Sequence, residues 1–301
     1  MDDSQLNTSR PRSGTFRPDR HTGLSRHAVG GGTCWLDNEA IERLDPSVLG
    51  ESILGIVEAL ARGESLQHEM LQENRRTSVQ VVTIEQRRWV VKRYRHRAGS
   101  LNRALRRSPV WREWRGARDL RRAGRRVYSI VAILDQRGLQ SLIYPFVEGS
   151  DLRHWLRGLR GPGVGNRAAG PPHTALARSI GHQMGSISAA GFISFDYRAR
   201  NLIVDEPCAS GGAEPMIIDA ARIRRRRKNG QVLSMLATFV RHDGVFWRAS
   251  IREAITCLRA LKQSDPTLAA PRRRRCSALG RSVIERAARQ TKGTPLEVES
   301  A

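Results

Sequence analysis

Apolar and polar positions follow two different periods along the chain, one typical of strands and one typical of helices. From Val79 to Ile84 and from Trp89 to Tyr94, β-branched and aromatic residues form two short runs that a polar turn joins. This pattern predicts a β-hairpin. Two further runs, Val127 to Leu134 and Gln140 to Val147, flank another polar turn and predict a second pair of strands.

Between the two strand pairs, the spacing changes to the helical period. Val110, Glu113, Ala117 and Leu120 fall on one face of a helix, and Gly124 is typical of a helix end. The order strand, strand, helix, strand, strand predicts a small antiparallel lobe that carries one helix.

The part of the chain before these strands shows two compositions. Residues 1 to about 30 are rich in Arg, Pro, Ser and Gly with almost no apolar periodicity, which predicts a disordered basic tail. Within 34–62, apolar residues recur at helical spacing, so we expect a helix that leads into the fold. The apolar residues of this helix are Ile53, Ile56, Val57 and Leu60.

The part after residue 148 is predicted to be mainly helical. One apolar stripe consists of Leu176, Ile180, Met184 and Ile187, and another of Leu233, Leu236, Phe239 and Val240. Between the stripes, the runs 202–204 and 216–218 predict a short hairpin with a long tip. A Gly/Pro-rich stretch at 161–172 predicts a loop, and 282–288 predicts a last helix.

These patterns divide the chain into four segments. We expect the basic tail at 1–30, an N-terminal lobe at 31–147, a C-terminal lobe at 148–265, and a basic C-terminal segment at 266–301 that contains Arg272 to Arg275. The apolar stretch 52–61 is too short for a membrane span of about 20 residues. The first residues lack the apolar core of a secretory signal, so we expect a cytoplasmic protein.

Charge and cysteine content narrow the function classes. The chain of 301 residues contains 52 Lys and Arg against 29 Asp and Glu, a net charge of +23. This excess favours an anionic partner, such as nucleic acid, an anionic membrane face or a phosphorylated substrate, and it is equally consistent with a solvated surface. Four cysteines without a CxxC pair indicate free thiols, not a zinc site or a disulfide framework.

Five residues have the order and the residue types that phosphoryl transfer needs. Lys92 ends an apolar strand, and Glu113 follows 21 residues later on the predicted helix. A strand lysine that pairs with a helix glutamate would be held in place to bind the α and β phosphates. Asp196 and Asn201 keep an Asp-x4-Asn spacing directly before a strand. Asp219 ends the next strand, and its carboxylate and the Asn201 amide offer the oxygens that Mg²⁺ prefers.

At these residues the chain resembles a known family. The stretch ISAAGFISFDYRARNLIV resembles the kinase pattern LHxxGxxHxDxxxxNIL. Together with VVKRY, REWRGARDLRRAG and IIDAARIRR, it makes the chain similar to the lipopolysaccharide kinases that phosphorylate Kdo or heptose sugars. The resemblance extends over about 79–261. It implies an α+β, protein-kinase-like fold of two lobes, the first a small antiparallel β lobe with one helix and the second larger and mainly helical.

The resemblance also implies roles for individual residues, with ATP and Mg²⁺ as cofactors. Lys92 would bind phosphate, and Glu113 would orient the Lys92 side chain. Asp196 would be the catalytic base. Asn201 and Asp219 would bind the metal, and Glu148 with Gly149 would lie beside the adenine. The acceptor would be a lipid-linked sugar or another small molecule, and the protein would work in the cytoplasm with the inner face of the inner membrane as a candidate surface.

The chain departs from protein kinases at several motif positions. Ser188 and Ser194 replace the two histidines of the pattern, and Ala221 stands where DFG has its glycine. Residues 74–78 lie where protein kinases have a glycine-rich loop, and no APE signature is found. Three alternatives to a sugar kinase therefore stay open. They are a protein Ser/Thr kinase, a pseudokinase that acts as a binding module, and a nucleic-acid-binding protein, for which charge is the sole support.

Overall fold

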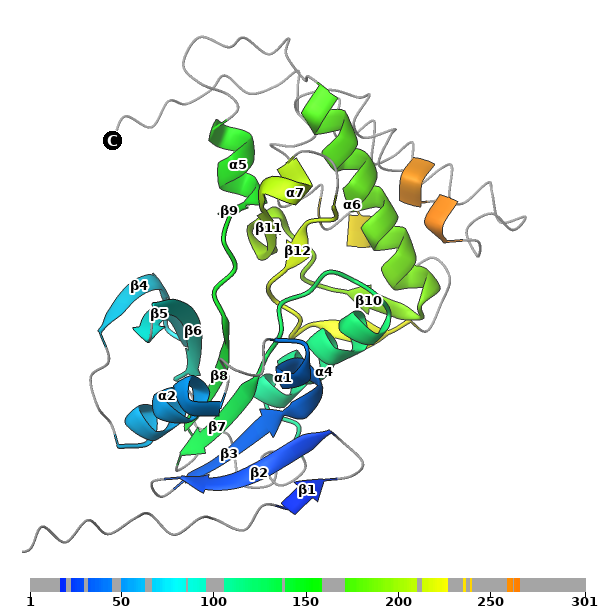
Figure 1. Cartoon of the computed structure of the whole chain (residues 1–301). Coiled ribbons are helices and arrows are strands. Elements are labelled where there is room, and N and C mark those ends of the chain that lie inside the picture. Colours follow the sequence, from blue (N-terminus) through cyan, green and yellow to red (C-terminus); the bar gives the residue numbers. More distant parts are fainter. Residues whose placement is uncertain are drawn as a thin grey trace, which may run out of the picture. The chain divides into compact units, whose positions relative to one another are not determined.

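The structure is a computed structural model of the chain, and Figure 1 shows the arrangement of its helices and strands. It describes residues 17–19, 23–29, 32–44, 50–62, 67–84, 86–95, 106–136, 139–158, 171–209 and 213–226, and the positions 235, 236, 239, 259–261 and 263–265.

The chain forms two compact units, each made of two separate stretches. The first unit comprises residues 1–103 and 130–146, and the second comprises 104–129 and 147–301. The sequence predicted a lobe boundary at 147/148, next to the last of the three places where the chain passes from one unit to the other. The helix after the first hairpin differs from that division, because residues 104–129 cluster with the second unit.

The first unit is built on one antiparallel sheet in the order β1-β2-β3-β7-β8-β6-β5-β4. The predicted hairpin is β5 (Thr77–Ile84) and β6 (Arg87–Tyr94), with Ile84 opposite Arg87 across a two-residue turn. Gln86 in this turn has φ +61°, a left-handed conformation that tight hairpin turns require. The second predicted pair is β7 (Ala132–Gln136) and β8 (Leu139–Pro145), and β8 lies against β6.

Three strands extend this sheet where the sequence had predicted a tail and a helix. They are β1 (Arg17–Asp19), β2 (Leu24–Val29) and β3 (Gly32–Asp37), and β3 pairs with β7. The prediction of a disordered tail was therefore wrong for the residues of β1 and β2. The physical reason is that these strands lie toward one edge of the sheet, where alternate positions stay exposed and polar residues are tolerated.

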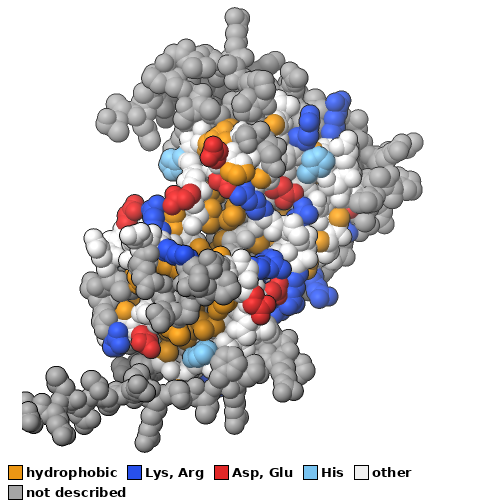
Figure 2. Space-filling model, in the orientation of Figure 1, with side chains coloured by type: hydrophobic (Ala, Val, Ile, Leu, Met, Phe, Trp, Pro, Cys, Tyr) orange, Lys and Arg blue, Asp and Glu red, His pale blue; other side chains and the backbone are white. Residues whose placement is uncertain are grey.

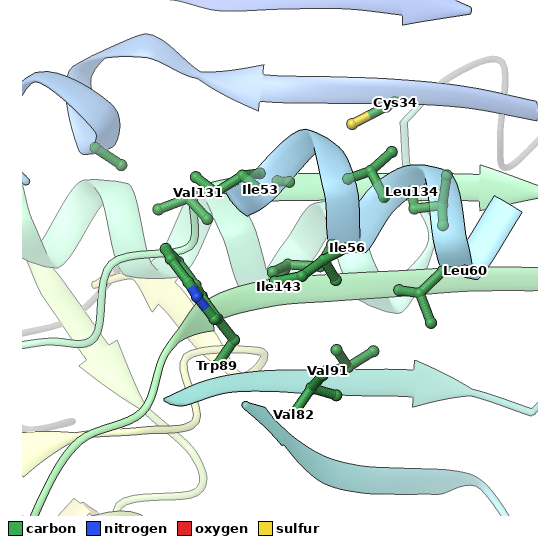
Figure 3. Close-up of a cluster of buried hydrophobic side chains, with 13 residues drawn as sticks. Cys34, Ile53, Ile56, Leu60, Val82, Trp89, Val91, Val131, Leu134 and Ile143 are labelled. Atoms are coloured by element: carbon green, nitrogen blue, oxygen red, sulfur yellow. The ribbon is translucent and has the colours of Figure 1, made fainter. Parts of the chain in front are cut away.

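The core of the first unit lies between the sheet and α2 (Gly50–Arg62), as Figure 3 shows. The helix predicted from periodicity is confirmed for these residues, and it follows the short helix α1 (Asn38–Glu42). Ile53, Ile56 and Val57 of α2 are fully buried in one cluster with Trp89 of β6 and residues of four other strands. At the far edge, β4 (His68–Glu73) pairs with β5 and is exposed along its whole length.

The second unit begins with the predicted helix, α4 (Pro109–Arg122). Its four predicted face residues are all buried, and Gly124 follows its end with φ +71°. Pro109 occupies the first turn, where the absent N–H costs nothing, and Arg121 and Arg122 complement the dipole in the last turn.

Short helices and strands make up the rest of the second unit. The longest helix is α6 (Pro171–Ala189), and its predicted stripe is buried throughout. The predicted short hairpin is β11 (Leu202–Val204) with β12 (Met216–Ile217). The remaining elements are β9 (Ser150–Asp151), α5 (Leu152–Gly158), β10 (Phe192–Ser194), a 3₁₀ turn at Ala199–Asn201, α7 (Glu206–Ala209) and β13 (Ile223–Arg225).

Several predictions lie outside the described residues. These are most of the loop at 161–172, the stripe positions Leu233 and Val240, the basic run Arg272 to Arg275, and the last helix at 282–288. Among the described helices, none combines the length and the hydropathy that a membrane span needs.

Candidate active site

The segment predicted as a catalytic loop connects β10 to β11 in the second unit. Asp196 follows β10, and its backbone N–H donates to the hydroxyl of Ser194 at 3.3 Å. Asn201 ends the loop, and its Nδ2 donates to the carbonyl of Asp196 at 2.9 Å. The loop is thus closed on itself by two polar side chains, which fixes Asp196 and Asn201 relative to each other.

Asp219 lies beside this loop because of strand pairing. Leu202 pairs with Ile217, and the N–H of Ile218 donates to the carbonyl of Asn201 at 3.0 Å. Asp219 is the next residue, and its Oδ1 accepts from the N–H of Ala221 at 3.1 Å. Backbone hydrogen bonds therefore bring the three predicted residues Asp196, Asn201 and Asp219 to the same end of one β ladder.

The Asp196 carboxylate is held by one cation and open on its other oxygen. Arg198 Nε lies 2.6 Å from Asp196 Oδ1, a contact whose angles suit an ion pair better than a hydrogen bond, and the Asp196 side chain is 15% exposed. No described residue donates a hydrogen bond to Oδ2. A carboxylate oriented in this way is suited to accept a proton from a group that approaches Oδ2.

The Asn201 amide offers an oxygen to the same region. Because Nδ2 is used by the Asp196 carbonyl, Oδ1 is the free atom of this amide, and no described residue donates to it. An amide oxygen and the carboxylate of Asp219 are hard donors of the kind that Mg²⁺ takes, usually together with water and phosphate. The residues present therefore fit a magnesium ion that is shared with a phosphate-bearing ligand.

Helix α4 packs directly on the segment that carries Asp219. A Cβ at Gly116 would lie 2.1 Å from the carbonyl oxygen of Ala220, so the helix approaches this segment as closely as only glycine permits. One turn earlier, Glu113 is fully buried, and Tyr128 donates its hydroxyl proton to Glu113 Oε1 at 2.5 Å. The predicted orienting glutamate is therefore held rigidly within its own unit.

Lys92 belongs to the first unit, at the centre of its sheet. It lies opposite Val79 of β5 and Leu142 of β8, and it is 9% exposed. Its Nζ lies 5.7 Å from the centre of the Tyr94 ring, on the same face of the strand. Lys92 therefore lies within β6, two residues before the end of the strand, and its binding of phosphate and its pairing with Glu113 stay predictions.

The turn at the place of a glycine-rich loop is closed by an asparagine. Asn74 Oδ1 accepts from the N–H groups of Arg76 and Thr77 at 2.8 and 2.9 Å. Backbone amides of this kind bind phosphate in glycine-rich loops. Since Asn74 occupies them here, this turn does not offer those two amides to a nucleotide.

The predicted hinge residues lie next to β11. Gly149 has φ +130°, and a Cβ there would lie 2.6 Å from the carbonyl oxygen of Val204. Glu148 is exposed, and the two residues after Gly149 form β9, which pairs with β11. Their role beside an adenine stays a prediction.

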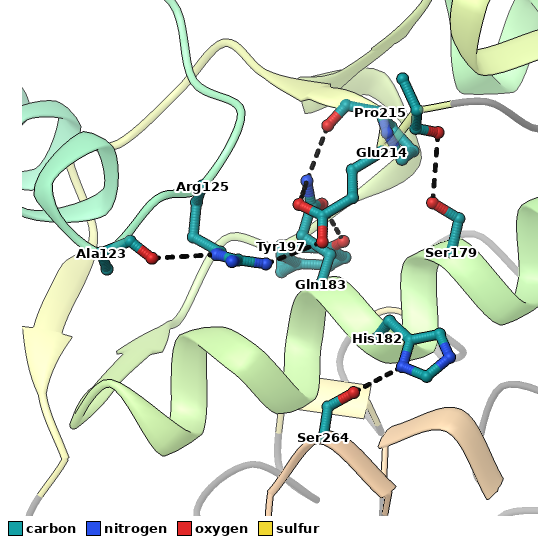
Figure 4. A network of polar contacts seen from close by, with 10 residues as sticks. Ala123, Arg125, Ser179, His182, Gln183, Tyr197, Glu214, Pro215 and Ser264 are labelled. Atoms are coloured by element: carbon teal, nitrogen blue, oxygen red, sulfur yellow. Dashed lines mark hydrogen bonds and ion pairs between the residues drawn. The ribbon is translucent and has the colours of Figure 1, made fainter.

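A polar network connects the predicted catalytic loop to the residues around it, as Figure 4 shows. The buried Tyr197 donates to Gln183 Oε1 at 2.5 Å, and Gln183 Nε2 donates to the Pro215 carbonyl at 2.7 Å. Arg125 contacts the Glu214 carboxylate at 2.8 Å. Burial raises the pKa of Glu214, and the charge of Arg125 opposes that rise. The network ties the loop to α6 and to the strand before Asp219.

A second buried cluster fixes the chain after β13. Ser188, the residue at the first histidine position of the pattern, donates to Asp265 Oδ2 at 2.5 Å. Arg226 donates to the same oxygen and to the Ser188 hydroxyl, both at 2.7 Å. Asp265 is fully buried, so this ion pair is shielded from water.

Sequence reasoning missed three residues of this site. Arg198 was one arginine among many, although its place two residues after Asp196 was a usable signal. Tyr128 and Gln183 had none, because the partners of Tyr128 and Gln183 are 15 and 14 residues away and only the fold brings them together.

Comparisons with known proteins give a fold but no family model. No protein-family model and no curated protein matches the chain. Among solved structures, WaaP in complex with acyl carrier protein has 17% identity and a TM-score of 0.53, covering 80% of this chain and 98% of that one. The BubR1 kinase domain has 13% identity and a TM-score of 0.41, covering 55% and 50%. The similarity to WaaP confirms the α+β fold that the sequence predicted.

Proposed function

We propose that the protein is an ATP-dependent phosphotransferase whose acceptor is a sugar hydroxyl, with Kdo or heptose of the lipopolysaccharide core as the first candidates. The observation that carries the proposal is the closed loop in which Arg198 holds one oxygen of Asp196 and leaves the other open, beside the oxygens of Asn201 and Asp219. The similarity in fold to WaaP, a heptose kinase of the lipopolysaccharide core, supports the reaction class.

The proposed roles follow from what each side chain offers. Asp196 accepts the proton of the acceptor hydroxyl at Oδ2, while Arg198 keeps the carboxylate oriented. Asn201 and Asp219 hold Mg²⁺, Lys92 binds phosphate, Glu113 orients Lys92, and Glu148 and Gly149 border the adenine. ATP with Mg²⁺ supplies the phosphoryl group and neutralises its charge when bound.

The rigidity of the second unit supports a positioning mechanism. Phosphoryl transfer depends chiefly on holding the reactants in line, with little covalent work for the protein. The loop is braced by Tyr197 and Gln183, and the Asp219 segment is braced by α4 at Gly116. Such bracing keeps a base and a metal site in register through the reaction.

The net charge of +23 supports an acceptor that is itself anionic or that lies at an anionic surface. A lipid-linked sugar at the cytoplasmic face of an anionic membrane would be such an acceptor. If the run from Arg224 to Arg227 serves that face, its replacement by Gln should weaken binding to anionic vesicles, and added salt should weaken the binding of the unchanged protein.

The test of the base is Asp196→Asn, with ATP turnover measured against lipid-linked sugars, free sugars and protein substrates. Asn has nearly the same shape but cannot take the proton, so turnover should fall by about 10² to 10⁴ while ATP binding persists. Glu206→Gln is the matched control, because Glu206 is exposed on α7 and also loses one carboxylate. Equal turnover of Asp196→Asn and the unchanged protein would refute the assignment.

The test of the metal site is Asp219→Ala, read as the Mg²⁺-dependent rise in melting temperature with ATP. The rise should disappear while the fold is retained. A rise that persists at full size would make Asp219 a structural residue.

A pseudokinase is the second candidate, and the closed turn at Asn74 favours it. This turn uses two of the backbone amides with which a glycine-rich loop binds phosphate. A protein that binds ATP without turnover on any acceptor, both unchanged and as Asp196→Asn, would support this alternative.

A further inference from the structure

A cavity of about 460 Å³ lies in the second unit between α4 and β13, and Asp196, Asn201 and Asp219 are not among the residues that line it. A volume of this size is typical of pockets that bind small molecules. Gly116 and Ile223 form part of its wall, and the close contact of Gly116 with Ala220 brings helix and strand together there. The charged residues that line it are Arg107, Arg112, Arg115, Asp119, Arg224 and Arg225.

The arginines of this cavity differ from five other arginines of the second unit. Arg125, Arg126, Arg198 and Arg226 each form an ion pair with a carboxylate. Arg118 instead stacks on a tryptophan ring of α4. These arginines have an evident structural partner.

The five cavity arginines form no salt bridge within the described residues. Arg115 and Arg224 each donate to backbone carbonyls, and both keep further N–H groups for a ligand. The single carboxylate of the cavity, Asp119, comes within ion-pair distance of none of them, so five positive charges face one negative charge.

The positive charges at the cavity also act on one another. Burial lowers the pKa of the Arg224 guanidinium, and the nearby charges of Arg112, Arg222 and Arg115 lower it further. Like charges held together in this way are stabilised when an anion enters. Figure 2 shows described basic side chains together with acidic ones on one face of the molecule.

We propose that this cavity is a binding site for a phosphate monoester, lined by none of the residues assigned to phosphoryl transfer. Helical spacing puts Arg112 and Arg115 on one face of α4, and Arg224 lines the cavity from β13. Guanidinium groups that converge from two elements suit the three oxygens and double charge of a monoester better than a singly charged diester. This proposal does not depend on the proposed phosphotransferase function.

The experiment measures binding of inorganic phosphate by calorimetry at low ionic strength, with ATP and Mg²⁺ present to fill the transfer site. The variant is Arg112→Gln with Arg224→Gln, and phosphate binding should weaken about tenfold or more, because charge-assisted hydrogen bonds are lost. The matched control is Arg153→Gln with Arg178→Gln, which removes the same charge at two exposed positions outside the cavity. Asp119→Asn should strengthen binding, since it removes the repelling carboxylate.

Vesicles of phosphatidylcholine with phosphatidic acid form the second arm, because phosphatidic acid presents a phosphate monoester on a lipid. If the protein binds phosphate but not these vesicles, the site is for a soluble ligand. If it also binds these vesicles, but does not bind vesicles with phosphatidylglycerol, the site is for a lipid headgroup. Equal phosphate binding by the cavity variant, the control variant and the unchanged protein would overturn the proposal. So would a weaker binding by Asp119→Asn.

Discussion

Gly116 offers the sharpest single test of how α4 is joined to the segment of Asp219. In Gly116→Ala the new Cβ would lie 2.1 Å from the Ala220 carbonyl oxygen, where Cβ atoms essentially never come closer than 3.0 Å to another heavy atom. Either α4 or the segment that contains Ala220 must therefore move by about 0.9 Å. Neither neighbour can give way cheaply, because the opposing atom belongs to the backbone.

The magnitude follows from two opposing effects. Overpacking of a close contact costs about 1–3 kcal/mol, and alanine in place of glycine inside a helix returns up to about 1 kcal/mol. We therefore expect Gly116→Ala to lower the free energy of unfolding by about 1–2 kcal/mol. Displacement of Ala220 should also reduce the Mg²⁺-dependent stabilisation by ATP, since Asp219 precedes it.

Gly55→Ala is the matched control for this substitution. Gly55 also lies inside a helix, α2, but a Cβ there meets nothing within 4 Å. It should raise stability by about 0.5–1 kcal/mol. Scanning calorimetry of both variants should thus give shifts of opposite sign, and a Gly116→Ala variant as stable as Gly55→Ala would refute the packing argument.

Three further predictions concern polar and backbone features of the second unit. The hydrogen bond from Arg126 lowers the pKa of Asp205 below 3.8, so its contribution to stability is present above that pH and lost as the pH falls through the lowered value. Asp205→Asn should cost about 2 kcal/mol in urea unfolding at pH 7, and the difference should shrink in acid. Asp265→Ala should cost about 3–5 kcal/mol because Arg226 loses a fully buried carboxylate, and the pair Asp265→Leu with Arg226→Met should recover much of this loss. Gly149→Ala should lower the melting temperature, because its φ of +130° and the 2.6 Å approach to a carbonyl both exclude a Cβ.

The sequence predicted those elements whose own residues determine them. Strands β5 and β6 are set by a local alternation and a two-residue turn, and α4 by a buried stripe that ends before Gly124. The sequence order of Asp196, Asn201 and Asp219 also predicted that these residues lie near one another, because β11 and β12 were recognisable as a strand pair. Their roles in phosphoryl transfer stay a proposal.

Features set by distant contacts were beyond the sequence. Strand β2 has a polar, arginine-containing sequence, and it is a strand because β3 pairs with it and β3 pairs with β7, about a hundred residues later. The role of Arg198 depends on an ion pair that its residue type does not reveal, and the hold of Tyr128 on Glu113 depends on tertiary packing. Such partners become visible when the chain is folded.

The buried cluster of Ser188, Arg226 and Asp265 has a consequence for the order in which the chain folds. Its members are 38, 39 and 77 positions apart, so it closes loops whose entropy must be overcome before any of its bonds can form. During synthesis, Ser188 and Arg226 leave the ribosome well before Asp265. The loop from Ser194 to Asn201 and the strands beside it are therefore synthesised before Asp265, whose carboxylate anchors the segment after β13. A chain shortened to end before residue 265 would keep every residue assigned to catalysis and lack this anchor.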